Sequence, residues 1–307
     1  MPLVERRARP PVLESSGLTL RYRPIMELPL QLAAEVQRNV LAALMEDIGG
    51  GDLTALLTPA TRCSQGAVVS REDAVLAGTA WFDACFRHLD PLAAIRWHAH
   101  DGEPVAAGQT LCEIGANTRA LLTAERSALN FLQLLSATAT ATRNYVDAVS
   151  GTGAQIVDTR KTLPGLRLAQ KYAVTCGGGT NHRLGLHDGI LIKENHIMAA
   201  GGVSAALAQA RAIGRNDVFI QIEVETLEQL AEALDAEATM ILLDNMDLAQ
   251  MRQAVGLTAG RAELEASGGV SLETVRAIAE TGVDRISVGS LTKNVRAIDL
   301  SLRHSEG

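Results

Sequence analysis

Basic side chains gather in one stretch of an otherwise acidic chain. The whole sequence has 28 basic and 35 acidic residues and a formal net charge of −7. Between residues 160 and 193, in contrast, Asp188 is the one acidic residue among Arg160, Lys161, Arg167, Lys171, Arg183 and Lys193. His182 and His187 add further hydrogen-bond donors to this stretch. Guanidinium and ammonium groups concentrated in this way indicate a site for an anionic ligand.

Carboxylates and glycine turns close several of the later apolar runs. Glu223 and Glu225 end one run and Asp244 ends the next, and the last two runs end in Ser267-Gly268-Gly269 and Gly289-Ser290. Glycines at strand ends expose backbone N–H groups, which is how barrel enzymes often bind a phosphate monoester. The pattern therefore predicts a ligand with anionic groups at one end and hydroxyl groups or a metal at the other. Spacing alone leaves open whether Glu223 or Glu225 contacts it.

These groups stand at the ends of short apolar runs that alternate with amphipathic segments. The six runs predicted as strands begin at Ile156, Ile190, Phe219, Met240, Leu264 and Arg285. Helices are predicted over 203–213, 227–234, 248–255 and 272–279, with C-caps expected at Gly214, Gly256 and Gly282. Strands separated by single helices form a parallel sheet, either a (β/α) barrel or a doubly wound sheet. A full barrel needs eight strands, so either two are hidden or the barrel is incomplete.

The first part of the chain has a different pattern. A helix is expected over 29–45, followed by a glycine-rich turn at 49–51 that lacks a P-loop lysine and is interpreted as structural. From 67 to 114, short alternating runs separated by glycines predict a small, mostly antiparallel sheet, with a covering helix at 81–86. A long helix is then expected from an N-cap at Thr123 to about Val149.

Composition argues against several classes of protein. The negative net charge and an aromatic content of 3% are unlike those of a nucleic-acid-binding protein. The four cysteines share no CxxC spacing, which argues against a zinc site or a disulfide scaffold. No apolar run is long enough to span a membrane, and residues 1–28 lack the apolar region of a secretory signal. We therefore expect a cytoplasmic protein with no nucleic-acid or membrane partner, preceded by a flexible extension over 1–28.

Several segments, taken in order, resemble the quinolinate phosphoribosyltransferase family. Residues 158–167 read Asp-Thr-Arg-Lys-Thr-Leu-Pro-Gly-Leu-Arg and resemble the core signature of that family. Similar segments lie at 125–130, 177–183, 190–196, 222–225, 242–245, 265–269 and 287–289. Together they cover nearly everything from about Leu30 to Leu291. The chain departs from the family pattern before about Leu28 and at Lys293-Asn294, beside the last phosphate turn.

The resemblance implies an α/β fold in which a small α/β sandwich domain precedes an incomplete parallel (β/α) barrel. The sandwich is expected over 29–124, joined by a C-terminal helix at about 292–307, and the barrel over 125–291. A homodimer is also implied, in which Arg126 of one subunit completes the site of the other. Assembly of dimers into hexamers is left open.

The implied reaction converts quinolinate and phosphoribosyl pyrophosphate to nicotinate mononucleotide, pyrophosphate and carbon dioxide, with Mg²⁺. Arginine forks and basic side chains suit a dicarboxylate. The expected partners of the quinolinate carboxylates are Arg126, Arg160, His182 and Arg183. Lys161 and Lys193 would hold the ring acid or the departing pyrophosphate.

Glycosyl transfer passes through a cationic, oxocarbenium-like ribose, which carboxylates can stabilise. Glu223 and Asp244 are expected in that role, binding the ribose hydroxyls or Mg²⁺, and with Lys161 and Lys193 they form the expected catalytic set. Mg²⁺ would be held mostly by pyrophosphate and water. The 5′-phosphate would be bound by Ser267, Gly268, Gly269, Gly289 and Ser290.

Other readings of the same residues stay open. A relative with the same scaffold could act on another acceptor, such as nicotinate, or resemble the molybdenum-transport-associated homologues of the family. The full basic set favours a dicarboxylate, because a monocarboxylate would leave several cations unpaired. A barrel aldolase or epimerase could use Lys193 as a Schiff-base lysine. A non-catalytic phosphate-binding protein is the third class, against which the density of strand-end charges argues.

Overall fold

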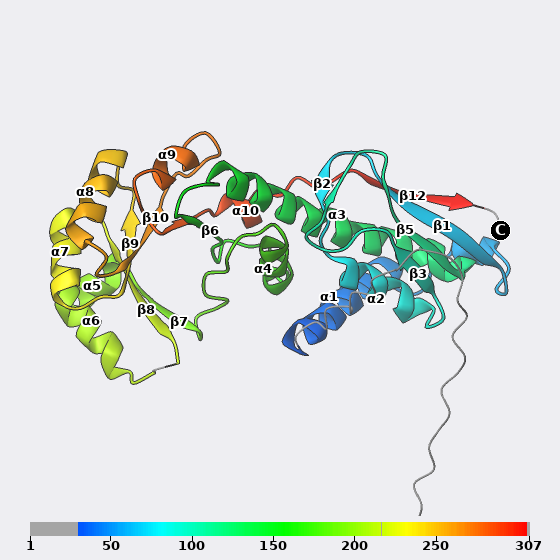
Figure 1. Cartoon of the computed structure of the whole chain (residues 1–307). Coiled ribbons are helices and arrows are strands. Elements are labelled where there is room, and N and C mark those ends of the chain that lie inside the picture. The colour runs from blue at the N-terminus through cyan, green and yellow to red at the C-terminus, as the bar shows by residue number, and fades with distance from the viewer. Residues whose placement is uncertain (1–29, 216, 306–307) are drawn as a thin grey trace, which may run out of the picture.

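The computed structural model describes residues 30–215 and 217–305, which form two α/β parts joined by one long helix (Figure 1). Each part has its own cluster of buried apolar side chains. The flexible extension expected over 1–28 lies outside the described residues. The predicted fold class, a small antiparallel-sheet domain followed by a parallel α/β domain, is confirmed.

The first part is an antiparallel sheet with helices packed against it. The strand order is β12-β1-β5-β3, with bounds Leu300–Ser305, Cys63–Ser70, Thr110–Asn117 and Ala94–Trp97. A second, two-stranded sheet pairs β2 (Ala74–Val75) with β4 (Pro104–Val105). The predicted covering helix is α2 (Thr79–Leu89), whose Phe82 ring lies 5.2 Å from that of Trp97 on β3. Helix α1 (Leu30–Ile48) packs beside α2, and the short η1 (Ala55–Leu57) follows the glycine turn.

The last described element is a strand, β12, so the C-terminal helix expected over about 292–307 is wrong for the residues described. A single helical turn, α10 (Ser290–Lys293), precedes β12, which pairs antiparallel with β1 and places Leu302 opposite Val68. Leu300 and Leu302 alternate with polar residues, so both leucines face the first core. This pairing also satisfies the edge of β1 that would otherwise be open.

Helix α3 (Thr118–Ala148) connects the two parts (Figure 1). It begins earlier than expected, because Asn117 is the N-cap and accepts hydrogen bonds from the backbone N–H groups of Arg119 and Ala120. Thr123, the expected cap, instead donates its hydroxyl to Asp52. The helix contributes residues up to Ala139 to the first core and Tyr145 to the second.

The second part is a parallel sheet of six strands in the order β6-β11-β10-β9-β8-β7. All six predicted runs are strands, with bounds Gln155–Val157, Arg285–Ser287, Glu263–Ser267, Met240–Asp244, Phe219–Val224 and Gly189–Ile192 in that order. Apart from β6, neighbours in space are neighbours in sequence, which is the order of a barrel and not of a doubly wound sheet. Within the described residues β6 and β7 do not pair with each other, so the barrel is open between them. The incomplete-barrel alternative is therefore correct.

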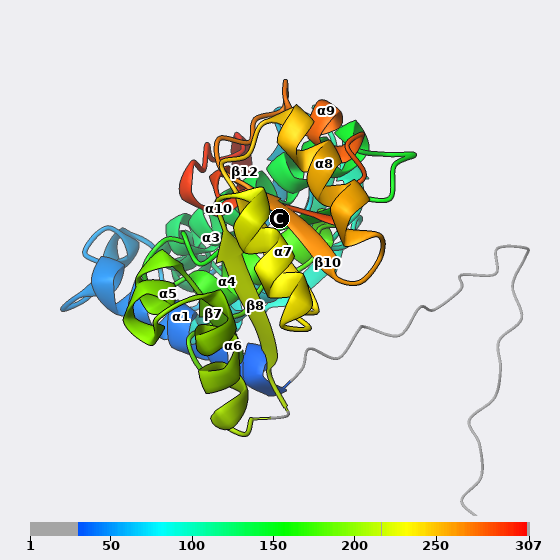
Figure 2. The same ribbon diagram turned by 90° about the vertical axis from the view of Figure 1, so that its left-hand side faces the viewer.

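The strands carry apolar residues outward and polar residues inward. On β8 and β9, Ile222, Val224, Ile241 and Leu243 belong to the second core, which the outer helices cover (Figure 2). Those helices are α5 (Glu194–Ala200), α6 (Val203–Ala212), α7 (Leu227–Asp235), α8 (Leu248–Thr258) and α9 (Val275–Ala279). Gly256, expected as a C-cap, lies inside α8, whose C-cap is Ala259 with a φ of 46°. Because side chains alternate along a strand, the residues between these apolar positions face the barrel interior.

Candidate active site

Cations and carboxylates near the strand ends form one group, the strand-end cluster, which consists of Lys161, Lys193, Glu223 and Asp244. Lys193 follows β7 and donates from Nζ to Glu223 Oε2 on β8 at 2.7 Å. Asp244 ends β9, and its pKa is raised, first by burial and then by the charge of Glu223, against the opposite effects of Lys193 and Lys161. The four predicted catalytic residues are therefore close enough to act on one another electrostatically.

Lys161 lies over the last glycine turn. A methyl group added at Gly289 would come within 3.2 Å of Lys161 Cδ and 4.0 Å of its Nζ, so the lysine would have to shift by a few tenths of an ångström. The Lys161 backbone is fixed as well, because its carbonyl accepts a hydrogen bond from the Thr292 hydroxyl at 2.8 Å. The lysine after β6 and the turn after β11 thus lie against each other.

A buried glutamine holds the loop that carries Arg160 and Lys161 in place. Gln170 is fully buried on α4 (Arg167–Cys176), accepts from the backbone N–H of Leu163, and donates to the carbonyl of Thr292 at 2.8 Å. Gln170 was not among the predicted site residues. Its position three residues after Arg167 in an otherwise apolar helix face was the available signal.

Arg160 and Arg183 are neighbouring guanidinium groups. Arg160 Nε is buried and has no hydrogen-bond partner within the described part of the chain. The pKa of Arg183 is lowered, mainly by burial and then by the charge of Arg160. Arg183 Nη1 donates to the carbonyl of Gly189 at 2.9 Å, which fixes the direction of its side chain. Two cations that repel each other, one with a free buried N–H, form a site suited to a carboxylate.

The run of three glycines before Arg183 lets the backbone approach α3 closely. A methyl group at Gly177 would lie 2.4 Å from the Ala139 carbonyl oxygen, and one at Gly179 would lie 2.7 Å from Thr142 Cγ2. The chain then bridges β6 at Thr180 and continues to His182 and Arg183. Close packing on α3 is therefore the reason for glycine here.

His182 is buried and both of its ring nitrogens bind protein groups. Nδ1 accepts from the backbone N–H of Arg183 at 2.7 Å, and Nε2 lies 2.7 Å from Gln221 Oε1. In this arrangement the ring has no free N–H for a substrate carboxylate, which was its expected role. The side chain supports the Arg183 backbone instead.

Asp158 and Lys171 form a buried ion pair beneath the loop, which the sequence did not reveal. Both side chains are almost completely inaccessible, and Lys171 Nζ donates to Asp158 and to the carbonyl of His182. Asp158 also accepts from the backbone N–H of His182 at 2.8 Å. Burial raises the pKa of Asp158 and lowers that of Lys171. Lys171 is thus a structural link between β6 and the His182 segment.

Asn245 links Asp244 to the glycine turn that follows β10 (Glu263–Ser267). Asn245 donates from Nδ2 to Asp244 Oδ2 at 2.8 Å and has a φ of 53°. A methyl group at Gly268, whose φ is 103°, would lie 2.1 Å from Asn245 Oδ1. Ser267, the last residue of β10, accepts from the Asn245 backbone N–H. Glycine is required here by both conformation and space.

The structure distinguishes Glu223 from Glu225, which their spacing in the sequence could not do. Glu223 lies within β8 and binds Lys193, whereas Glu225 lies beyond the strand end and is exposed. Glu223 is therefore the one that belongs to the cluster.

Within one chain, Arg126 lies far from the strand-end cluster. It is exposed on α3, nineteen positions before Tyr145, whose hydroxyl lies 3.3 Å from Ser290 Oγ. At the rise of an α-helix this separation is roughly 28 Å. Around Arg126 lie Leu122 on the same helix and the segment anchored by the Thr123–Asp52 hydrogen bond, where Leu53, Leu56 and Leu57 are exposed.

The oxygen donors of the cluster match a lightly held Mg²⁺. Within 30–215 and 217–305, no three His, Cys, Asp or Glu side chains are grouped so as to hold a metal ion. Glu223 and Asp244 provide two carboxylates, and Mg²⁺ is often bound by one or two carboxylates with phosphates and water. The two carboxylates therefore fit a metal that takes most of its ligands from phosphate groups and water.

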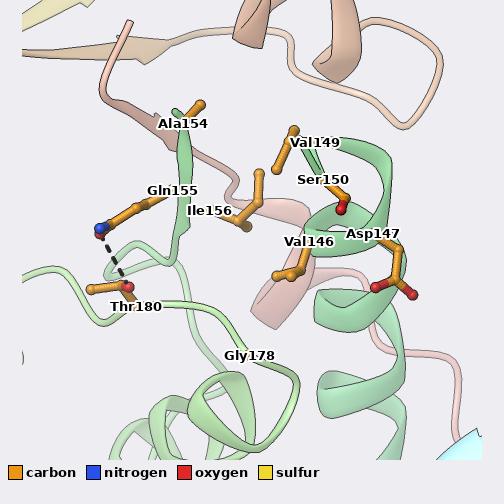
Figure 3. Close-up of a pocket in the computed structure, with 9 residues that line it drawn as sticks. All are labelled: Val146, Asp147, Val149, Ser150, Ala154, Gln155, Ile156, Gly178 and Thr180. Carbon is orange, nitrogen blue, oxygen red and sulfur yellow. Dashed lines mark hydrogen bonds between the residues drawn. The ribbon is translucent and has the colours of Figure 1, made fainter. Parts of the chain in front are cut away.

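A cavity of about 370 Å³ lies away from this cluster, where α3 ends and β6 begins (Figure 3). Asp147 is the one charged side chain among its nine lining residues, and Ser150, Gln155 and Thr180 provide its neutral polar side chains. Such a lining is unsuited to a highly charged substrate, so the strand-end cluster is the better candidate for the chemistry.

In the described part of the chain, no helix is long and apolar enough to cross a membrane.

Comparisons with known proteins bear on the family of the chain. The model of the quinolinate phosphoribosyl transferase C-terminal domain matches residues 138–303, and that of the N-terminal domain matches 52–136. A Bacillus subtilis protein named probable nicotinate-nucleotide pyrophosphorylase [carboxylating] is 42% identical over 258 residues, which cover 84% of this chain and 89% of that protein.

A tobacco (Nicotiana tabacum) protein named quinolinate phosphoribosyltransferase [decarboxylating] 2b, mitochondrial, is 42% identical over 90% of this chain and 84% of its own. Among solved structures, the nicotinate-nucleotide pyrophosphorylase from Francisella tularensis has a TM-score of 0.87 at 42% identity, covering 91% of this chain and 98% of that one.

Proposed function

The chain belongs to the quinolinate phosphoribosyltransferase family and is a pentosyltransferase of that class, and we propose that the strand-end cluster is its catalytic site. The reaction converts quinolinate and phosphoribosyl pyrophosphate to nicotinate mononucleotide, pyrophosphate and carbon dioxide. The ring nitrogen forms a bond to the anomeric carbon as the bond to pyrophosphate breaks. The carboxylate beside that nitrogen leaves as carbon dioxide, and the ring carbon that carried it takes up a proton from solvent.

The two neighbouring guanidinium groups carry the proposal. Arg160 has a buried Nε without a partner among the described residues, and Arg183 is held beside it by Gly189. A dicarboxylate would supply the missing hydrogen bonds and relieve the repulsion between the two cations. His182 supports this subsite through the Arg183 backbone.

The cluster beside that subsite suits the transfer step. Positive charge develops on the ribose as pyrophosphate departs, and the carboxylates Glu223 and Asp244 would stabilise it and bind the ribose hydroxyls. Lys161 and Lys193 would bind the oxygens of the departing pyrophosphate. Mg²⁺, when bound with pyrophosphate, would neutralise part of its charge. The turns at Ser267-Gly268-Gly269 and Gly289-Ser290 would bind the 5′-phosphate.

A Schiff-base reaction at Lys193 is less consistent with the geometry. A Schiff-base lysine needs a neutral amine, usually in a desolvated pocket. Lys193 is about half exposed, and its ammonium group binds Glu223. A paired, solvated lysine is suited to binding phosphate oxygens instead.

We further propose a homodimer in which Arg126 enters the partner's quinolinate subsite. Its distance from the cluster of its own chain and its apolar surroundings support this arrangement, since exposed leucines around an arginine are typical of protein interfaces. A cytoplasmic location remains our proposal.

The function is tested by incubating the purified protein with phosphoribosyl pyrophosphate, Mg²⁺ and either quinolinate or nicotinate. Equal amounts of carbon dioxide and nicotinate mononucleotide from quinolinate, and little product from nicotinate, are expected. Absence of product from quinolinate in folded protein, or preference for nicotinate, would overturn the assignment.

A further inference from the structure

Below the Lys193–Glu223 pair, the barrel interior holds a second polar layer that the reaction does not use directly. It consists of His182, Gln221, Glu265 and Arg285, all buried or nearly so. Gln221 precedes Glu223 by two residues on β8, so the two side chains face the same way on successive levels. Barrel interiors are usually filled by branched apolar side chains, and buried polar groups are costly unless they are paired. This layer therefore needs a functional reason.

Hydrogen bonds within the layer run in one direction. The backbone N–H of Arg183 donates to His182 Nδ1, so Nδ1 carries no hydrogen and the neutral ring has its hydrogen on Nε2. That N–H donates to Gln221 Oε1 at 2.7 Å. Gln221 Nε2 in turn donates to Glu265 Oε2 at 3.1 Å. Because a carboxylate only accepts, Glu265 fixes which end of the Gln221 amide faces the histidine.

Burial favours the neutral form of the ring, against the opposite effects of the Glu265 charge and the Gln221 hydrogen bond. Glu265 Oε2 lies 3.8 Å from His182 Nε2, but Arg285 Nε lies 3.2 Å from the same carboxylate and offsets its charge. Lys171, held by Asp158, also lies near the ring. Burial has the largest effect and lowers the pKa of His182. A neutral ring with a fixed tautomer is the outcome.

We propose that Gln221 and Glu265 are positioning residues for quinolinate binding that act through His182. This inference rests on the proposed function, in which Arg183 binds a quinolinate carboxylate. Gln221 holds the hydrogen of the ring on Nε2, which leaves Nδ1 to accept from the Arg183 backbone. The backbone at Arg183 is thereby fixed, and its guanidinium is directed beside Arg160. Loss of the Gln221 amide lets the ring change tautomer or rotate, and Arg183 then loses its support.

The first test is ¹⁵N NMR of histidine-labelled full-length protein without ligands, with the His182 signals assigned by difference from His182→Gln. The expected spectrum at neutral pH shows an unprotonated Nδ1 and a protonated Nε2 for His182. In Gln221→Leu, which keeps a side chain of similar bulk but removes its hydrogen bonds, this single tautomer is lost. A protonated Nδ1 or a charged ring in the wild-type protein would overturn the proposal.

The second test separates the two substrates by steady-state kinetics. Gln221→Leu is expected to raise KM for quinolinate about tenfold or more, because small displacements of a binding group are costly, and to change KM for phosphoribosyl pyrophosphate by less than about twofold. Glu265→Gln keeps an acceptor oxygen for Gln221 and should resemble the wild type more closely than Glu265→Leu does. Gln155→Leu, the same substitution at the start of β6 outside the layer, is the matched control.

An unchanged KM for quinolinate in Gln221→Leu, or equal increases in both KM values, would contradict the positioning role. Failure of the wild-type protein to turn over quinolinate would instead contradict the proposed function, and the NMR result would still report on the tautomer. The two failures are therefore distinguishable.

Discussion

Asn39, on the first helix of the sandwich domain, donates its side-chain amide to the carbonyl oxygen of Gly165 at 3.1 Å, across 126 positions of sequence. Arg38 donates to the same oxygen at 2.7 Å and is held by Glu35 one turn earlier. Gly165 belongs to the loop that begins with Arg160 and Lys161 and has a φ of 78°. The first part of the chain thus helps to position the loop that carries Arg160 and Lys161, which we propose binds substrate.

Arg38→Ala should lower kcat/KM for quinolinate by about tenfold, because the loop loses one of its two anchors on α1. Thermal stability should change little, since the arginine is more than half exposed. Kinetics and melting temperature of the variant give the result. Arg87→Ala is the control, because Arg87 is a similarly exposed helix arginine paired with Asp83 that does not contact the loop. Equal activity losses in both variants would contradict a positioning role for Arg38.

Lys193→Met should reduce kcat by about 100-fold or more, because a cation aimed at the departing pyrophosphate is removed. The free energy of unfolding should change by less than about 1 kcal/mol, since the lysine is about half exposed and the pair is screened by solvent. Product assays and urea unfolding are the measurements. Arg276→Met breaks an ion pair of equal length, also 2.7 Å, on the outer surface and should leave kcat unchanged. A Lys193→Met enzyme of nearly wild-type kcat would remove Lys193 from the catalytic set.

Gly268→Ala should lower kcat/KM for phosphoribosyl pyrophosphate by about tenfold or more and destabilise the protein by about 1–2 kcal/mol. An alanine would have to adopt a φ of 103° and would displace Asn245, which holds Asp244. Gly256→Ala is the comparison, because Gly256 lies inside α8 with open space around it. That variant should gain about 0.5–1 kcal/mol of stability without a kinetic effect. A fully active Gly268→Ala would show that this turn is not constrained.

The strand ends could be predicted because each combines two local signals, an apolar run and a polar residue where the run stops. Glu223 and Asp244 stand out in the sequence for that reason. Gln221 carried the same signal, since it alternates with Ile220 and Ile222, but a single amide inside an apolar run was read as part of the strand. Its partner Glu265 is distant in sequence, so only the fold shows that they meet.

Contacts between residues that are distant in the sequence explain why other features could not be predicted correctly. Lys171 reads as a surface residue of a short helix, and its burial depends on Asp158, which comes from another strand. The last segment pairs with β1 from the opposite end of the chain, so its strand conformation depends on an edge that local pattern does not reveal. Thr123 is of a residue type that often caps helices, yet Asn117, the last residue of β5, is the N-cap of α3.

Folding stability should decrease below about pH 6.5 in a way that depends on His182. Burial lowers the pKa of His182 in the folded protein, whereas the unfolded chain takes up a proton near the ordinary value of 6.5. Acidification through this window therefore favours the unfolded state. His182→Gln removes this contribution, so the difference in unfolding free energy between wild type and variant should shrink as pH falls from about 7.5 to about 5.5.

Urea unfolding at both pH values measures this difference. Asp158, whose pKa is raised to about 6, titrates in the same window with the opposite sign, but it is present in both proteins and its contribution cancels to first order. A difference that does not depend on pH would show that the folded protein does not depress the His182 pKa.

The most direct test of the shared catalytic site is subunit mixing of two inactive variants, Arg126→Ala and Lys193→Met, with quinolinate and phosphoribosyl pyrophosphate as substrates. After unfolding and refolding an equal mixture, half of the dimers should be mixed, and each of those should have one site with both residues intact. The expected activity is about one quarter of the wild-type value. If the mixture stays as inactive as either variant alone, although mixed dimers form, Arg126 and Lys193 do not meet across subunits and the account of the site is wrong.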